Sequence, residues 1–458
     1  MRQKYYLKLN FQKAYFKEML VIGLPVTLQS IFQASYSLVD QLMVGSLGTV
    51  SIAGSGLGAK FSSLVTVTIS AVAAVASILI AQYHGNKDKA GINQSFFSCF
   101  YIAMAVMLLF AIPSIFIPDY VMSLYTTDLK TVQMAANYLR IIAISFMPMT
   151  ITMLLSSLLR SMEMSRVPMY ASILSMGANI LFNYIFIFGK FGMPRLSLIG
   201  AGIGTLIARS IETFILICMI FGKKFRNELT LHPVAFRNSF YRKISGMVIP
   251  ILLNEFLWSF GENIYAAIYG RLGTQSLAAV TLTNPIQAMF IGMFTGVSSA
   301  AAVMVGKRLG QDDKEAAYDI SKYLVKVGLV GSVMIGSILV FLATPYVTLF
   351  SIEPEVARLT RYLIYALAIV LFAKITNMIL AGGIIRSGGN THYTLIIDLI
   401  GTWVFGVPLA LIAGYVWRLP VYLVYFILSQ EELIRLILGF HVFRKKKWMK
   451  NITKESKL

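Results

Sequence analysis

The second half of this 458-residue chain repeats the first half at a spacing of about 225 residues. The stretch that begins PVTLQSIFQ at Pro25 has its counterpart in PILLNEFLW at Pro250. The residues that agree in one ungapped register are Pro25 with Pro250, Gly45 with Gly270, Gly48 with Gly273, Ala53 with Ala278 and Gly85 with Gly310. In a membrane protein such a duplication is what alternating access requires, because rocking one half against the other exposes a central site to either side. The repeat therefore indicates a secondary transporter.

The composition agrees with a membrane protein, since 57% of the residues are hydrophobic and only 13% are charged. We expect an all-α polytopic membrane protein with about twelve transmembrane helices in two pseudo-symmetric six-helix lobes. The expected spans are residues 19–45, 52–80, 93–117, 133–158, 168–189, 198–222, 247–270, 278–306, 323–345, 359–382, 390–415 and 419–441. The expected lobes are residues 1–222 and residues 244–458, which end in a basic tail, with a cytoplasmic linker at 223–243.

The net charge of +20 is distributed over alternate loops. Lysine and arginine gather before the first span, in the linker, in the C-terminal tail and in every second loop between them, whereas the opposite loops carry few. The basic loops include Lys87, Arg160, Lys307 and Arg386. This asymmetry follows the positive-inside rule and predicts a multi-pass protein of the cytoplasmic membrane with both termini in the cytoplasm. The basic residues are thus expected to set the topology and to contact anionic lipid, and no nucleic-acid partner is expected.

The chain shows no pattern of catalytic residues. Its four histidines occur singly, its two cysteines lie inside apolar spans, and no Gly-x-Ser-x-Gly elbow or phosphate-binding glycine loop occurs in the required context. We therefore expect no enzyme, no catalytic residue and no cofactor.

Polar residues inside the first span lie on one helical face, at Gln29, Gln33, Ser37 and Asp40. Asp40 follows Pro25 by about 22 Å of helix at 1.5 Å per residue. A lone carboxylate inside an apolar span either holds a cation or is protonated, because an uncompensated charge there is costly. The alternative is a hydrogen-bonded carboxylate at the end of the helix, in a short loop.

The fifth and sixth spans offer partners for Asp40. Asn179 and Asn183 are one helical turn apart, and Thr205 follows in the next span. With Asp40 they can form an oxygen-rich site for a monovalent cation such as Na+, or a hydrogen-bonded cage around a protonatable carboxyl group. The alternative is that the two amides only bind neighbouring helices.

The second repeat carries different residues at the matching positions, since Tyr265 replaces Asp40 and Glu262 replaces Ser37. Other charged residues in the apolar spans of this half are Glu255, Lys374 and Asp398. We expect a charge network in which Lys374 neutralises Glu255 or Glu262. A structural role and a transport role for this network are equally open.

These features together resemble the multidrug and toxic compound extrusion (MATE) family of antiporters, over nearly the whole chain. The resemblance rests on the duplicated six-helix plan, on Pro25, Asp40, Gly45 and Gly48, on the loops HGNKDKA and LGQDDKEA, on IIRSGGNT and on the final KKWMKN. It implies two lobes of six helices and export of organic, often cationic or amphipathic, compounds in exchange for Na+ or H+. It also implies a cation-coupling site at Asp40, Asn179, Asn183 and Thr205, and a bend of the first helix at Pro25.

The chain departs from the family pattern at two places. Asn183 stands where many members carry a second acid, and Lys374 stands near where one branch carries an aspartate. The first departure leaves the coupling ion open between Na+ and H+, and the second favours coupling in the first lobe.

We expect small drugs or toxic organic compounds as substrates, and a monomeric protein. The expected cavity between the lobes is lined by polar, aromatic and methionine side chains, which suit promiscuous binding. These residues are Gln33, Tyr36, Ser37, Met43, Trp258, Tyr265 and Met289. The nearest alternative is a lipid-linked oligosaccharide flippase of the same broad fold group, which should carry a more basic cavity.

Overall fold

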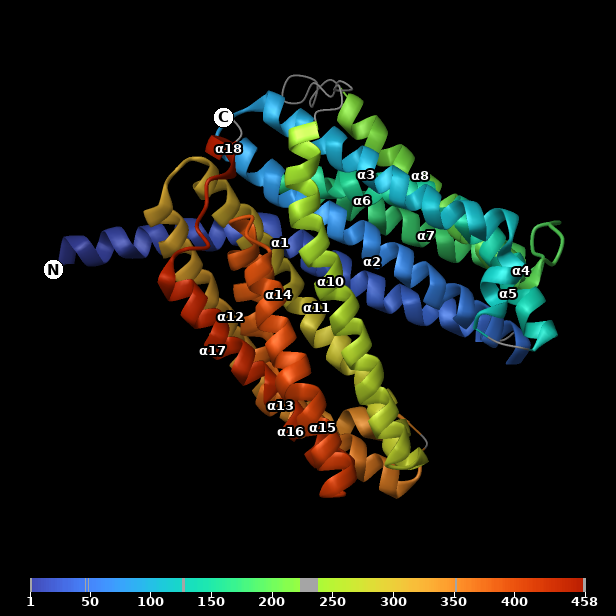
Figure 1. Cartoon of the computed structure of the whole chain (residues 1–458). Coiled ribbons are helices and arrows are strands. Elements are labelled where there is room, and N and C mark those ends of the chain that lie inside the picture. Colours follow the sequence, from blue (N-terminus) through green and yellow to red (C-terminus); the bar gives the residue numbers. More distant parts are fainter. Residues whose placement is uncertain are drawn as a thin grey trace. The chain divides into compact units, whose positions relative to one another are not determined.

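All regular structure in the described part of the chain is helical (Figure 1). The computed structural model describes residues 2–45, 47, 49–125, 128–222, 238–350 and 352–455. The α-helices are α1 (Arg2–Gly45), α2 (Thr49–Gly85), α3 (Lys89–Phe116), α4 (Pro118–Ser123), α5 (Leu129–Ile144), α6 (Phe146–Ser161), α7 (Arg166–Phe188), α8 (Ser197–Phe221), α10 (Asn238–Arg271), α11 (Thr274–Gly310), α12 (Lys314–Thr348), α13 (Pro354–Asn377), α14 (His392–Leu399), α15 (Val407–Leu411), α16 (Val421–Leu428), α17 (Glu431–Lys445) and α18 (Ile452–Glu455). Three π-helical segments are η1 (Met378–Ile385), η2 (Ile400–Gly406) and η3 (Ile412–Val416).

The helices occur where the sequence predicts membrane spans. Nine helices within the described residues are long and apolar enough to cross a membrane, or ten if the bent pair α5–α6 forms one span. Helix α1, and α16 with α17, occupy the first and last predicted spans without being among the nine. The all-helical, multi-pass class predicted from the sequence is therefore confirmed.

The chain divides into two compact units. We call Leu28–Ser245 the N-unit, and Met1–Thr27 together with Gly246–Leu458 the C-unit. The boundary thus falls inside α1, two residues after Pro25, and α1 is one continuous helix through this proline. The predicted bend at Pro25 and the predicted lobes at 1–222 and 244–458 stay predictions. Most of the predicted linker, residues 223–237, lies outside the described residues.

The internal repeat extends to local backbone geometry. Helices α2 and α11 both contain 37 residues, and their first and last residues differ by the same 225 positions that the sequence repeat uses. After each helix one residue adopts a left-handed conformation, Lys87 at φ 57° and Asp312 at φ 64°. The next residue, Asp88 or Asp313, caps the following helix by accepting a hydrogen bond of 2.9 Å from the amide three residues later. The two loops HGNKDKA and LGQDDKEA therefore form the same turn.

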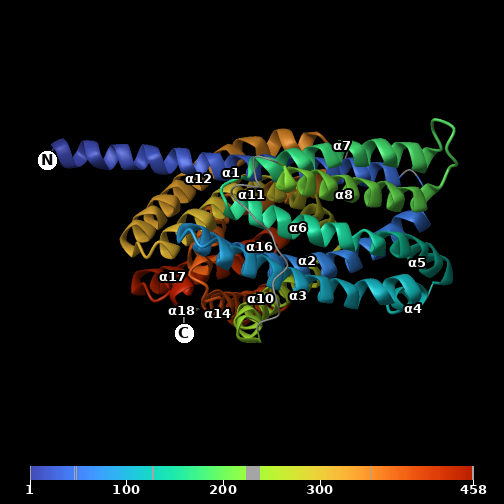
Figure 2. The ribbon, with the colours of Figure 1, turned by 90° about the horizontal axis from the view of Figure 1, so that it is seen from above.

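The N-unit is built around α2, which packs against α3, α5 and α6, while α7 and α8 lie side by side along their length (Figures 1 and 2). One of its buried clusters includes Phe61, Val65, Ile69, Met107, Leu139 and Phe146. Helices α5 and α6 meet at an angle of 45° at Ser145. Pro148 follows in the first turn of α6 and has no amide hydrogen to continue the hydrogen bonding of α5, which accounts for the break.

The C-unit is built around α11 and α13. Helix α11 packs against α12, α13 and η1, and α13 also contacts α16 and α17. Its buried cluster includes Met304, Leu324, Leu363, Leu371, Ile379 and Ile384. The span that begins with α13 ends in the π-helical segment η1, and the following span contains η2 and η3. Such segments are frequent at functional sites.

Candidate functional site

A polar cluster in the N-unit brings together the four residues that the sequence groups around Asp40. Asn183 Nδ2 donates hydrogen bonds to Asp40 Oδ1 at 2.7 Å and to Asn179 Oδ1 at 2.6 Å. Asn179 Nδ2 donates to Thr205 Oγ1 at 3.3 Å. The carboxylate at the end of α1 is thus connected through two amides of α7 to a hydroxyl of α8. We call this group the Asp40 cluster.

The amide nitrogen of Asn183 faces both Asp40 and Asn179, which present oxygen atoms to it, and its Oδ1 faces the other way. That Oδ1 is buried and has no hydrogen-bond partner within the described part of the chain. Unsatisfied buried oxygens are rare in proteins, and each one calls for a partner such as water or an ion.

The close packing of α7 against α8 depends on Gly204. A Cβ atom placed on Gly204 would overlap the free oxygen of Asn183, so only glycine leaves this oxygen in place. Asp40 itself forms no ion pair within 4.0 Å in the described ranges. A carboxylate, amides and a hydroxyl without a positive side chain are groups of the types that bind a hard monovalent cation, and they equally suit a protonated carboxyl group. In this structure Asn183 presents its nitrogen, not its oxygen, to Asp40.

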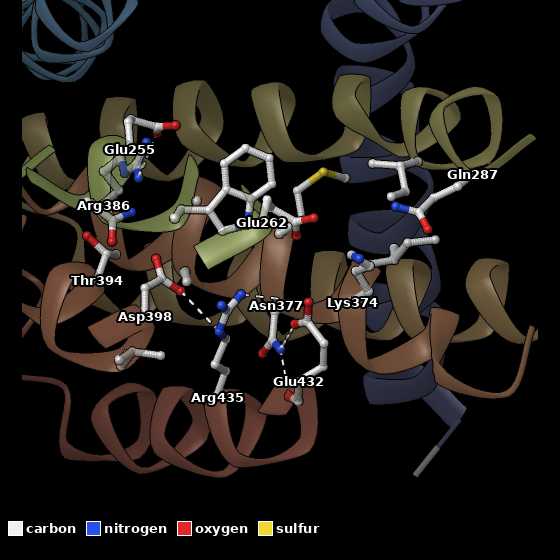
Figure 3. Close-up of a pocket in the computed structure, with 18 residues that line it drawn as sticks. Glu255, Glu262, Gln287, Lys374, Asn377, Arg386, Thr394, Asp398, Glu432 and Arg435 are labelled. Atoms are coloured by element: carbon white, nitrogen blue, oxygen red, sulfur yellow. Dashed lines mark hydrogen bonds and ion pairs between the residues drawn. The ribbon is translucent and has the colours of Figure 1, made fainter. Parts of the chain in front are cut away.

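A cavity of about 520 Å³ lies entirely within the C-unit (Figure 3). It is lined by charged, polar and apolar side chains of α10, α11, α13, η1, α14 and α17. The lining residues are Asn254, Glu255, Trp258, Glu262, Gln287, Ile291, Lys374, Ile375, Asn377, Met378, Ala381, Gly382, Arg386, Thr394, Ile397, Asp398, Glu432 and Arg435. We call it the C-unit cavity.

Arg435 compensates three carboxylates beside this cavity. Its guanidinium lies 3.6 Å from Asp398, 3.3 Å from Glu431 and 3.7 Å from Glu432, and it also donates to the hydroxyl of Thr402. The side chains of Arg435, Glu431 and Glu432 are only 7–8% exposed. Buried charges of this kind persist only when they are paired and hydrogen-bonded.

Further hydrogen bonds hold the two glutamates of α17. Tyr265 donates its hydroxyl hydrogen to Glu431 Oε2 at 2.7 Å, and Asn377 Nδ2 donates to Glu432 Oε2 at 2.8 Å. Gly406 of η2 makes the first contact sterically feasible, because a Cβ atom there would overlap both Tyr265 and Glu431. The tyrosine that replaces Asp40 in the repeat is therefore a hydrogen-bond donor to a carboxylate of a distant helix.

Glu255 lies 3.9 Å from Arg386, the residue that follows η1 and lines the C-unit cavity. Lys374 forms no ion pair within 4.0 Å in the part of the chain that the structure describes. The predicted neutralisation of Glu255 or Glu262 by Lys374 therefore stays a prediction. Of the predicted network, Glu255, Glu262, Lys374 and Asp398 all line this one cavity (Figure 3).

The residues predicted to form a substrate cavity occupy different environments. In the C-unit, Trp258 lines the cavity and is 45% exposed, Met289 is 42% exposed, and Tyr265 is buried. In the N-unit, Gln33 is exposed and Met43 packs against Val44 and Ile187. The side chains of Tyr36 and Ser37 lie outside the described ones. Their common role stays a prediction.

Four residues of this region were missing from the sequence prediction: Arg386, Glu431, Glu432 and Arg435. The signal for three of them is the run EELIR, which places two acids and an arginine on adjoining turns of the last apolar span. Ionisable residues at such a position are expensive and therefore usually paired. Arg386 carries no comparable signal, because an arginine beside a glycine-rich turn is typical of an ordinary loop.

Comparison with known proteins gives consistent matches. The family model described as MatE matches residues 25–185 and 250–412. "Probable multidrug resistance protein NorM" of Thermotoga maritima is 23% identical over 437 residues, which cover 95% of this chain and 93% of the relative. The protein of the same name from Photorhabdus laumondii is 26% identical over 400 residues, with 86% and 87% covered. A crystal structure of a MATE protein in complex with MaL6 matches with a TM-score of 0.86 at 19% identity, covering 94% of this chain and 95% of that one.

Proposed function

The chain belongs to the MatE family, and from that premise we propose that it is a secondary active multidrug exporter of the membrane. It exports organic, often cationic and amphipathic, compounds in exchange for Na+ or H+. The two matched segments coincide with the two halves of the internal repeat, which is the architecture that alternating access needs. The relatives named as multidrug resistance proteins support the same class of substrate.

The observation that carries the proposed ion coupling is the Asp40 cluster. Its carboxylate has neutral partners only, and the neighbouring Asn183 Oδ1 is buried without a partner within the described residues. A carboxylate in an apolar span needs a compensating positive charge, and here an ion from outside supplies it. Asp40, Asn179, Asn183 and Thr205 are therefore the proposed coupling residues, with Asp40 as the ligand of Na+ or as the acceptor of H+.

Exchange follows from a conformational change of α1. When a cation binds at Asp40, the segment of α1 that carries Asp40 moves toward α7 and α8. The helix bends near Pro25, because proline leaves one backbone hydrogen bond unmade there. The division of α1 between the two compact units two residues later supports this position. Drug affinity falls as the cation binds, and by linkage the drug weakens cation binding by the same factor.

The drug lies against Gln33, Tyr36, Ser37, Met43, Trp258, Tyr265 and Met289 in this proposal. Methionine and aromatic side chains adapt their packing to ligands of different shape, which suits a promiscuous exporter. In this proposal the protein acts as a monomer in the cytoplasmic membrane. Both termini lie in the cytoplasm, because the basic residues gather in alternate loops and at both termini.

Transport by purified protein in liposomes tests this function. Ethidium efflux is driven separately by an inward Na+ gradient and by an inward H+ gradient, with Asp40→Asn as the test variant and Asp119→Asn, at an exposed site on α4, as the matched control. We expect one gradient to drive efflux in the wild-type protein and in Asp119→Asn, and no driven efflux in Asp40→Asn. Undiminished efflux in Asp40→Asn would assign coupling to the C-unit residues Glu255, Glu262 and Lys374. If neither gradient drives efflux of ethidium or of any other drug tested, antiport is contradicted.

A further inference from the structure

Three sequence motifs of the second half meet at one place in the C-unit. LGQDDKEA forms the junction of α11 and α12, IIRSGGNT forms the junction of η1 and α14, and KKWMKN follows α17. Residues 446–454, which we call the docked tail, contact both of the other motifs. Trp448 in this segment is fully buried, and Met449, Ile452 and Thr453 are 3–7% exposed. The docked tail is therefore a packed part of the C-unit.

Aromatic stacking holds the start of the docked tail. Lys446 adopts a left-handed conformation at φ 56°, and the chain returns from there to α17. The ring of Trp448 stacks on Phe443 of α17 with a centroid distance of 5.9 Å, and its Nε1 donates a hydrogen bond of 3.2 Å to the carbonyl of Phe443. Phe443 stacks in turn on Tyr318 of α12 at 4.9 Å. A buried tryptophan that is both stacked and hydrogen-bonded binds the tail to these two helices.

The turn between η1 and α14 accommodates the docked tail only because it contains glycine. We call residues 386–391 the glycine turn. A Cβ atom on Gly388 would overlap the backbone carbonyl of Trp448, and a Cβ atom on Gly389 would overlap the side chain of Ile452. Gly389 also has a φ of 78°, a left-handed conformation that glycine adopts without strain. The contact with the tail thus explains both glycines of IIRSGGNT.

A weaker contact joins the docked tail to the junction of α11 and α12. Lys454 Nζ lies 2.6 Å from Asp312 Oδ2, and Asn451 Nδ2 donates a hydrogen bond of 3.3 Å to the same carboxylate. The side chains of Lys454 and Asp312 are 67% and 44% exposed, and an ion pair so exposed contributes little. Docking therefore depends mainly on Trp448 and on the glycine turn.

The glycine turn begins with a residue that lines one end of the C-unit cavity. Figure 3 shows Arg386, Glu255 and Thr394 at this end, and Gln287 and Lys374 at the other end. Thr394 lines the cavity but is only 1% exposed, and the side chain of Arg386 is only 17% exposed. We call this the tail end of the cavity. Its low exposure indicates that it is closed in this structure.

The glycine turn also joins two walls of the cavity. Thr391 Oγ1 donates a hydrogen bond of 3.1 Å to the backbone carbonyl of Met247 on α10, and α14 begins at the next residue. The docked tail contacts this turn and the helices α12 and α17 at the same time. Movement of the turn relative to α12 and α17 therefore breaks the contacts of Trp448 and Ile452.

We propose that the docked tail keeps the tail end of the C-unit cavity closed, and that it must leave the glycine turn before this end opens. In the topology proposed above, the tail end faces the cytoplasm. The docked tail then stabilises the state in which the cavity is closed on that side, and its release favours the state that is open there. This role goes beyond the proposed function, because it needs neither a particular ion nor a particular substrate.

Thiol labelling of the purified full-length protein measures the closure. Cys99 and Cys218 are first replaced by alanine. A single cysteine is then introduced by Thr394→Cys at the tail end, or by Gln287→Cys at the other end. The reagent is 2-sulfonatoethyl methanethiosulfonate, whose charge keeps it in water. Its rate of reaction with the Thr394→Cys protein follows the population in which the tail end is open.

Two variants weaken the contact from opposite sides. Trp448→Ala removes the stacked ring, and Gly388→Ala places a Cβ atom against the carbonyl of Trp448. We expect each to raise the labelling rate of Thr394→Cys at least about 10-fold and that of Gln287→Cys less than about 2-fold. Lys454→Met should raise the Thr394→Cys rate less than about 2-fold, because its ion pair is exposed.

Matched controls exist for both variants. Trp417→Ala removes a tryptophan that is 56% exposed. Gly246→Ala adds a Cβ atom that meets nothing within 4 Å in the described part of the chain. Both controls should leave the two labelling rates as they are without them.

Two outcomes overturn the proposal. One is an unchanged Thr394→Cys rate in Trp448→Ala and Gly388→Ala. The other is an equal increase at Thr394→Cys and Gln287→Cys, since the tail would then stabilise the C-unit as a whole and not one end of its cavity. Labelling does not require transport, so ion-driven ethidium efflux by the wild-type protein tests the proposed function separately. Absence of efflux would reject only the export function, and either labelling outcome would reject only the closing role of the tail.

Discussion

Position 40 of the first repeat and position 265 of the second are equivalent in the 225-residue register, yet one is an aspartate and the other a tyrosine. Asp40 accepts a hydrogen bond from Asn183, whereas Tyr265 donates one to Glu431. In the N-unit the α1 helix therefore supplies the acid and α7 supplies neutral amides. In the C-unit the acids around Arg435 come from α14 and α17.

The two units differ in the source of the positive charge that compensates their carboxylates. Arg435 and Arg386 are built into the C-unit and pair with four carboxylates there. The Asp40 cluster contains no arginine or lysine within ion-pair distance in the described ranges. A cluster that carries its own cations has less need of an ion from solution, and a cluster that lacks them requires one. This contrast is the basis of our proposal that ion exchange takes place in the N-unit.

The largest expected effect comes from removing the built-in cation of the C-unit. Arg435→Met leaves Asp398, Glu431 and Glu432 without their common partner, and such a loss typically costs roughly 3–5 kcal/mol of stability. Unfolding of the purified protein in detergent, followed by heat or denaturant, measures this change.

Arg358→Met is the matched control for Arg435→Met. Arg358 forms an exposed pair with Glu355 at 2.8 Å on the surface of α13, and its loss should cost less than about 1 kcal/mol. Equal stabilities of the two variants would show that the C-unit carboxylates do not depend on Arg435, and the contrast between the units would then fail.

The next effect concerns the geometry of the Asp40 cluster without any change of charge. Gly204→Ala places a methyl group against Asn183 Oδ1 and should reduce ion-driven efflux by about 10-fold, because displacing one hydrogen-bonding group of a charged site costs about 1–3 kcal/mol. Gly177→Ala on α7 is the matched control, since a Cβ atom there meets nothing within 4 Å, and it should keep the wild-type rate. Equal rates in the two variants would argue against Asn183 as a coupling residue.

The smallest effect is expected outside the membrane, at the C-terminal tail. Lys454 donates a hydrogen bond of 2.6 Å to Asp312, and together with Asn451 it lowers the pKa of the Asp312 carboxyl below its ordinary value of 3.8. A lowered pKa means that this stabilisation is complete above the ordinary pKa and is lost as the pH falls through the folded-state pKa. The difference in thermal midpoint between wild type and Lys454→Met should therefore be small at neutral pH and shrink below about pH 3.8.

Lys447→Met, at an exposed position of the same tail, should show no such pH dependence. A Lys454→Met difference that stays constant down to about pH 2 would mean that the lysine does not act through the charge of Asp312.

Apolar spans of sufficient length predicted the helices, and the spacing of Asn179 and Asn183 predicted that both share one helical face. That these two residues form one site with Asp40 and Thr205 was implied by the resemblance to the MATE family, not by periodicity. The partners in the C-unit could not be derived in the same way. Periodicity shows which residues of one helix face together, but it does not show which distant helices meet. Arg386 reaches Glu255 across 131 positions of the chain, a contact that only the packed fold defines.

The division of α1 was also beyond the sequence. Its apolar pattern continues through Pro25 and gives no sign that the residues up to Thr27 pack with the second half of the chain. The π-helical segments were likewise not predicted. Gly406 of η2 closely approaches Tyr265 and Glu431, a contact that composition alone does not reveal.

The central claim is that a cation and a drug exclude each other through Asp40, and equilibrium ethidium binding by the purified protein tests it most directly. Binding is measured with and without Na+ and at two pH values, for the wild-type protein, Asp40→Asn and Asp398→Asn. We predict that one of the two cations weakens binding at least about 5-fold in the wild-type protein and in Asp398→Asn, and has no effect in Asp40→Asn. Cation sensitivity that persists in Asp40→Asn and disappears in Asp398→Asn would contradict the assignment and place ion exchange in the C-unit.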